Sequence, residues 1–99
     1  QDPNHREEIQ KAFEHPRAVV IDVRQPNEIT ARVEAKNQWI NAPGTLVDCP
    51  DLSYSSDAML PDKTVPIILY CESGLRAQKA TEILQRQGYS QVWNAGGIE

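Results

Sequence analysis

The sequence predicts an α/β protein with a central, mostly parallel β-sheet and helices on both of its faces. The first observation is a pair of apolar, β-branched runs without alternation, at residues 18–23 and 65–71, which is typical of strands covered on both faces. The second is two shorter runs of similar character, at residues 39–42 and 91–95. The third is that helix-like segments lie between these runs, because strands that alternate with helices favour a parallel sheet with crossovers.

Two clear helical patterns lie outside the strands. Asp2 as a cap and Pro3 at the first helical position predict a short amphipathic helix near the start of the chain. Apolar residues with helical spacing predict a second helix over residues 75–87, which Gly88 ends. A weaker pattern indicates a further helix that starts near Asn27.

The segment from residue 43 to residue 66 gives the weakest prediction. It is rich in Pro, Asp, Ser and Thr, and we expect a long loop with about one turn of helix at residues 57–60. Cys49 lies in this loop with neither strand-end nor helix-start context, so we expect a passive or partly exposed thiol. Loops of this kind often form the wall of a site.

The composition limits the kind of protein and partner. A chain of 99 residues has room for one domain, which we expect to span residues 1–99. A formal charge of −4 disfavours nucleic acid and anionic membranes as partners, and no apolar run approaches the roughly 20 residues of a membrane helix. We therefore expect a soluble protein, monomeric by default, that acts on small molecules or other proteins.

Cysteine and histidine are too few and too scattered to predict a metal site. Cys49 and Cys71, with His5 and His15, show no zinc-type spacing, and two cysteines make no disulfide scaffold. We expect no metal. The chain starts with Gln1 rather than Met, which indicates a processed mature form or an excised piece from which any targeting segment has gone.

The stretch "LYCESGLRAQKA", residues 69–80, places Cys71 between a buried strand and a helix. A loop in this position points backbone N–H groups and the positive end of the helix dipole at its centre, so it favours an anion such as a thiolate. The thiolate is the nucleophilic form of cysteine, and Gly74 permits the tight backbone that the loop needs. The alternative is that Cys71 is a buried filler at a strand end.

The neighbours of Cys71 leave several interpretations open. Arg76 could bind an anionic substrate, hold the loop by bonding a carboxylate such as Asp22, or lie solvated in the first helical turn. Glu72 is more typical of a solvated loop residue than of an acid catalyst. A dyad of Cys71 with His5 or His15 is disfavoured, because both histidines flank the first helix, far from Cys71 in the sequence.

The stretch "CESGLRA", residues 71–77, resembles the active-site loop of the rhodanese family, Cys-x-x-Gly-x-Arg followed by a small or hydroxyl residue. Further stretches resemble the family in the family's own order: "VVIDVRQPNE" at 19–28, "INAP" at 40–43, "LPDKTVPIILYC" at 60–71 and "LQRQGYSQVWNAGGIE" at 84–99. The length is most similar to that of small single-domain thiosulfate sulfurtransferases, including the exported phage-shock type.

The resemblance implies a rhodanese-like fold and a covalent cycle on Cys71. Cys71 would take the outer sulfur of a donor such as thiosulfate, become a persulfide, and pass that sulfur to cyanide or a thiol. The resemblance implies no organic cofactor and no metal. The loop residues that would surround the persulfide with backbone N–H groups are Glu72, Ser73, Gly74, Leu75 and Arg76. Asp22 and Arg24, in the Asp-Val-Arg signature that Glu28 follows, would be structural supports.

Three departures from the family pattern are visible. The chain has Glu34, Ala35 and Lys36 where the family usually has Gly-His-Ile, so the turn there is expected to differ. Glu72 adds a negative charge directly after the cysteine, which should weaken activity with anionic thiosulfate. The chain ends at Glu99, where relatives usually continue.

The compartment of the protein is undetermined, with the periplasm slightly favoured over the cytoplasm because of the resemblance to exported members.

Three other functions are alternatives to sulfur transfer. A cysteine phosphatase or arsenate reductase of the same fold has a loop one residue longer, whereas a shorter ring of N–H groups suits a single sulfur atom better than a phosphate. A non-catalytic rhodanese-like module would bind a partner or relay sulfur within an assembly. A Cys49–Cys71 redox pair would need the two thiols to meet, and nothing in the sequence brings them together.

Overall fold

The computed structural model describes residues 3–29, 38–45, 49–72 and 74–97. Within these residues the elements are α1 (Pro3–Glu14), β1 (Val19–Asp22), a 3₁₀ turn (Pro26–Glu28), β2 (Gln38–Asn41), α2 (Pro50–Met59), β3 (Ile67–Cys71), α3 (Leu75–Arg86) and β4 (Val92–Gly97). All four predicted strands and both clear helices are confirmed.

The strands that the structure describes form a four-stranded sheet in the order β2-β1-β3-β4. Every neighbouring pair is parallel, with Asp22 of β1 beside Tyr70 of β3 and Asn41 of β2. The carboxyl ends of β1 and β3 therefore meet at one edge of the sheet, where ligands of such folds bind. The last residue of β3, at that edge, is Cys71.

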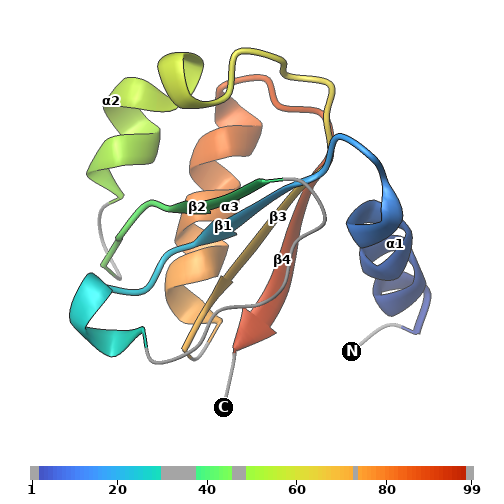
Figure 1. The fold of residues 1–99 in the computed structure, drawn as a ribbon, viewed down its shortest axis with the longest axis horizontal. Coiled ribbons are helices and arrows are strands. Elements are labelled where there is room, and N and C mark those ends of the chain that lie inside the picture. The colour runs from blue at the N-terminus through green and yellow to red at the C-terminus, as the bar shows by residue number, and fades with distance from the viewer. Residues whose placement is uncertain (1–2, 30–37, 46–48, 73, 98–99) are drawn as a thin grey trace.

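The helices cover both faces of the sheet, so the predicted fold class is confirmed (Figure 1). On one face, α2 and α3 pack on alternate strand residues that include Ile21, Leu69 and Cys71. On the other face, α1 packs on Val20 and Tyr70. The central strands β1 and β3 are buried along their whole length, which explains why their sequences show no polar alternation.

The prediction for the segment between residues 43 and 66 was wrong in one respect. It contains a ten-residue helix, α2, rather than one turn at residues 57–60. Pro50 lies in the first turn of α2 and Asp51 follows it, a favourable start that the loop-like composition hid. Of its ten residues, only Leu52 and Ser56 are buried, so α2 presents almost no apolar stripe in the sequence.

Cys49 is also corrected by the structure. It occupies the N-terminal cap position of α2, whereas we expected no helix-start context. With 0% of its surface exposed, it is a buried thiol rather than a partly exposed one. It packs in the core cluster on the α2 and α3 face. The predicted helix near Asn27 is a short 3₁₀ turn in the described part of the chain, and the departure at Glu34 to Lys36 lies outside the described residues.

None of the helices that the structure describes is long and apolar enough to cross a membrane.

Tyr89 ties the end of α2 to the segment that leads into β4. Its hydroxyl contacts the carbonyl oxygens of Ser56 and Leu60 at 3.0 and 2.7 Å, and the side chain is buried. Leu60 is the C-terminal cap residue of α2, and its own N–H already binds the Ser56 carbonyl at 2.7 Å. The hydroxyl of Tyr89 therefore adds a donor at the end of the helix, where carbonyl oxygens run out of backbone partners.

We expect Tyr89→Phe to lower the free energy of unfolding by about 1–3 kcal/mol, because it leaves buried carbonyl oxygens without their hydroxyl donor. Urea denaturation followed by circular dichroism measures this loss. Tyr54→Phe is the matched control, since Tyr54 on α2 is 87% exposed and should tolerate the same change. Equal effects of the two substitutions would contradict this account of Tyr89.

Candidate active site

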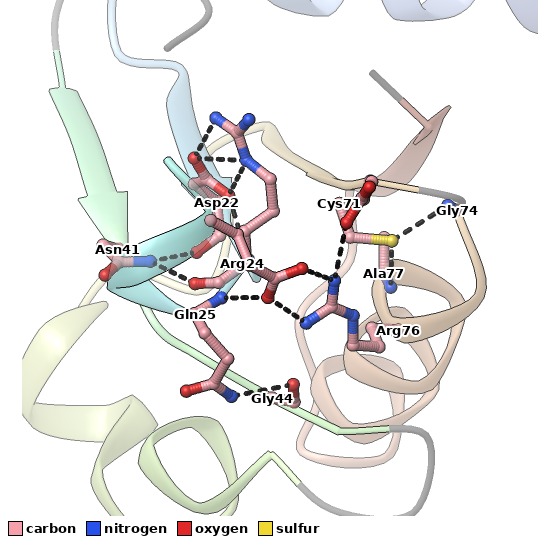
Figure 2. Close-up of polar contacts among 11 residues, drawn as sticks. Asp22, Arg24, Gln25, Asn41, Gly44, Cys71, Gly74, Arg76 and Ala77 are labelled. Atoms are coloured by element: carbon pink, nitrogen blue, oxygen red, sulfur yellow. Dashed lines mark hydrogen bonds and ion pairs between the residues drawn. The ribbon is translucent and has the colours of Figure 1, made fainter. Parts of the chain in front are cut away.

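The sulfur of Cys71 lies at the N-terminus of α3, as the sequence predicted. Its Sγ accepts hydrogen bonds from the backbone N–H groups of Gly74 at 2.9 Å and Ala77 at 3.4 Å (Figure 2). Gly74 is the cap residue of α3 and has no side chain that could accept these bonds. Backbone donors and the positive end of the helix therefore both favour negative charge on this sulfur.

Gly74 gives the loop its tight turn. Its φ of 89° lies in the left-handed region, which residues with a Cβ rarely adopt. Its carbonyl oxygen accepts a bond from the side-chain amide of Asn94 on β4, at 3.3 Å. Asn94 in turn accepts the N–H of Gly96 at 2.8 Å, so its orientation is fixed. Neither Asn94 nor the N–H of Ala77 was predicted from the sequence. The contact of Asn94 joins residues that are far apart in the chain, and Ala77 lies beyond the expected loop.

Arg76 holds the loop by bonding a carboxylate, but that carboxylate belongs to Glu28 rather than Asp22. The two terminal nitrogens of Arg76 contact the two oxygens of Glu28 at 2.7 and 2.8 Å. The N–H of Gln25 also donates to Glu28, at 2.9 Å. The bonds from Arg76, and then that from Gln25, lower the pKa of Glu28 to about 2. The bond to Glu28 raises the pKa of Arg76.

The remaining loop residues face outward. The Glu72 side chain is 65% exposed, and one of its oxygens lies 3.9 Å from a nitrogen of Arg76. Leu75 is 63% exposed, which is unusual for a large apolar residue. Cys71 itself has no exposed surface. Ser73, which was also predicted to line the site, lies outside the described residues.

Asp22 and Arg24 form a buried ion pair on the opposite face of the sheet from Cys71. The Asp22 carboxylate accepts the backbone N–H of Arg24 and its side-chain Nε and Nη2, at 2.8–3.1 Å (Figure 2). It also accepts the hydroxyl of Tyr70 at 2.9 Å, and that hydroxyl accepts the indole N–H of Trp39 at 2.7 Å. Tyr70 directly precedes Cys71, so this chain of bonds fixes the end of β3.

The side chains that the structure describes contain no group of three or more His, Cys, Asp or Glu residues that could hold a metal ion. The larger described surface cavity, of about 360 Å³, lies at the amino ends of the strands, where Val19, Gln38 and Val65 line it. It is therefore remote from the loop that holds Cys71.

We expect Asp22→Ala to lower the free energy of unfolding by about 3–5 kcal/mol, because it leaves the buried guanidinium of Arg24 without its counterion. Urea denaturation measures the loss. The control is Asp57→Ala, which removes an ion pair between Asp57 and Lys63. The Asp57 side chain is 82% exposed, so loss of this pair should hardly change the free energy of unfolding. A small effect of Asp22→Ala would contradict the role assigned to this pair.

We expect Glu28 to stabilise the fold in a pH-dependent way. Its pKa of about 2 in the folded protein lies below the ordinary value of 4.5, so its contribution is complete above about pH 4.5 and disappears as the pH falls toward 2. The measurement compares the unfolding free energies of wild type and Glu28→Gln across this range. Their difference should shrink as the solution becomes more acidic, and a difference that does not change with pH would contradict the ion pair's role.

Comparisons with known proteins identify the family. The family model of the rhodanese-like domain matches residues 5–99. The thiosulfate sulfurtransferase PspE of Escherichia coli is 42% identical over 79 residues, which are 80% of this chain and 69% of that protein. A tRNA uridine(34) hydroxylase of Erwinia tasmaniensis is 30% identical over 92% of this chain, but the match covers only 25% of that enzyme. A solved structure described as rhodanese with anions from Escherichia coli superposes with a TM-score of 0.67 at 33% identity, and covers 82% of this chain and 87% of that one. The chain therefore belongs to the rhodanese-like domain family.

Proposed function

We propose that the protein is a sulfurtransferase that carries a sulfane sulfur as a persulfide on Cys71. The observation that carries the proposal is the pair of N–H groups, from Gly74 and Ala77, that converge on one sulfur atom at the start of α3. The relationship to PspE, whose name is that of a thiosulfate sulfurtransferase, supports the same class of reaction.

The cycle has two steps, and each exchanges one sulfur–sulfur bond for a new bond. The thiolate of Cys71 attacks the outer sulfur of thiosulfate, the bond inside the donor breaks, and sulfite leaves with the electron pair. A thiolate or cyanide then attacks the outer sulfur of the persulfide, and Cys71 leaves as a thiolate. Cys71 is the leaving group in the second step. The hydrogen-bond donors that stabilise negative charge on its sulfur therefore assist that step as well.

The burial of Cys71 restricts the shape of the donor. Because the residue has no exposed surface, sulfur uptake requires the surrounding loop to open. A donor whose reactive sulfur is a terminal atom needs a smaller opening of the loop. An electrophile whose reactive atom bears several substituents needs a larger one. This requirement favours sulfane sulfur donors over bulkier electrophiles.

The position of Arg76 argues against a phosphatase or arsenate reductase. An oxyanion of that kind is best bound by a free guanidinium fork. Both terminal nitrogens of Arg76 already contact Glu28, at 2.7 and 2.8 Å. Arg76 supports the loop instead, which is sufficient for a reaction at a single sulfur atom.

We expect Cys71 to gain the mass of one sulfur atom when the protein is incubated with a sulfane donor. Thiosulfate and 2-hydroxyethyl persulfide, whose hydroxyethyl group carries no charge, are used in parallel, and peptide mass spectrometry locates the added sulfur. Cys71→Ser should abolish the gain. Cys49→Ala, which keeps an apolar side chain in the core, should leave it intact. Transfer of the sulfur to cyanide would complete the cycle.

Two results would overturn the proposal. Failure of both donors to load Cys71 in folded protein would favour a non-catalytic binding module. Hydrolysis of an aryl phosphate that depends on Cys71, without uptake of sulfur, would place the protein among the phosphatases.

A further inference from the structure

The charges at the mouth of the loop point to a kind of donor. This inference rests on the proposed function and concerns only which sulfur donor the site selects. Arg76 is only 16% exposed, and its charge is compensated by Glu28, whose carboxylate is fixed by Gln25 as well. A substrate anion could use Arg76 only by displacing Glu28 from a bidentate pair.

Glu72 then leaves the loop with an excess of negative charge. It follows Cys71 directly, and its side chain is 65% exposed. The charged side chains that the structure places together at the loop are Glu28, Glu72 and Arg76, and their formal sum is −1. Nearby Arg24 does not change this sum, because its guanidinium is only 6% exposed and is paired with Asp22.

We propose that Glu72 makes the site selective for persulfide donors that carry an ammonium group. The acceptor of that ammonium is the exposed carboxylate of Glu72, the residue that follows Cys71. Thiosulfate, a dianion, meets repulsion at the same place, as does a donor with a carboxylate.

The transfer from such a donor balances without an added oxidant or reductant. The thiolate of Cys71 attacks the outer sulfur of R–S–SH, and a new bond forms between the two sulfur atoms. The sulfur–sulfur bond of the donor breaks, and the aminothiol leaves as its thiolate with the electron pair. The proton stays on the transferred sulfur.

The test uses three persulfides of the same length: 2-aminoethyl persulfide, 2-hydroxyethyl persulfide and 2-carboxyethyl persulfide. The rate at which Cys71 gains sulfur is measured by quenched mass spectrometry at low ionic strength. The variants are wild type, Glu72→Gln and Glu72→Lys. Glu7→Gln is the control, since it removes an equal charge from an exposed position on α1, away from the loop.

We expect the ratio of the aminoethyl rate to the carboxyethyl rate to be the informative quantity. Intrinsic differences in donor reactivity cancel when this ratio is compared between variants. Two unit charges roughly 5 Å apart in a water-like medium change a rate by about fourfold. Glu72→Gln removes an attraction from the aminoethyl donor and a repulsion from the carboxyethyl donor, so it should lower the ratio by about sixteenfold at low salt. Glu72→Lys should lower it further, Glu7→Gln should preserve it, and added salt should reduce the wild-type ratio.

The inference is overturned if the ratio is the same in wild type and Glu72→Gln, or if it is higher in Glu72→Gln or Glu72→Lys than in wild type. Those outcomes leave sulfur transfer by Cys71 intact, because sulfur is still taken up. If no donor loads Cys71 in wild type or in either Glu72 variant, the proposed function fails, and the inference fails with it.

Discussion

The sulfur of Cys71 takes the place of the side-chain cap that α3 lacks. A helix begins with N–H groups that have no partner within the helix, and a Ser, Thr, Asp or Asn side chain usually accepts one of them. Here the cap residue is Gly74, and the N–H groups of Gly74 and Ala77 donate instead to Sγ of Cys71. One interaction therefore closes the turn from β3 into α3 and directs two backbone N–H donors at the sulfur of Cys71.

The rest of the structure keeps that turn in place from several directions. Asn94 binds the carbonyl of Gly74 from β4, and Glu28 binds Arg76 from the segment after β1. On the opposite face, Asp22 receives the hydroxyl of Tyr70, the residue before Cys71. Loss of one partner of a buried ion pair is costly, because the other charge is left buried and uncompensated. We infer that these pairs hold the position of the loop as well as stabilising the fold.

The sequence was sufficient for the features that depend on neighbours along the chain. Unalternated apolar runs predicted the strands, and Gly74 between a strand and a helix predicted the tight backbone of the loop after Cys71. It was insufficient where contacts join distant segments. The pair of Glu28 with Arg76 spans 48 positions, so its partner could not be chosen from spacing. The length of α2 was underestimated because its only buried residues are Leu52 and Ser56. The partner of Ser56 is Gln87, which lies 31 positions further along the chain.

The central claim is that the N–H groups of Gly74 and Ala77 hold the sulfur that reacts. The most direct measurement is a proton–nitrogen correlation spectrum of the protein before and after loading with a sulfane donor, with the loaded fraction determined by mass. The account predicts that amide signals of Gly74 and Ala77 appear at new positions. The intensity of these new signals should be proportional to the fraction of Cys71 that carries sulfur. Unchanged signals from these two amides in protein that carries sulfur on Cys71 would contradict it.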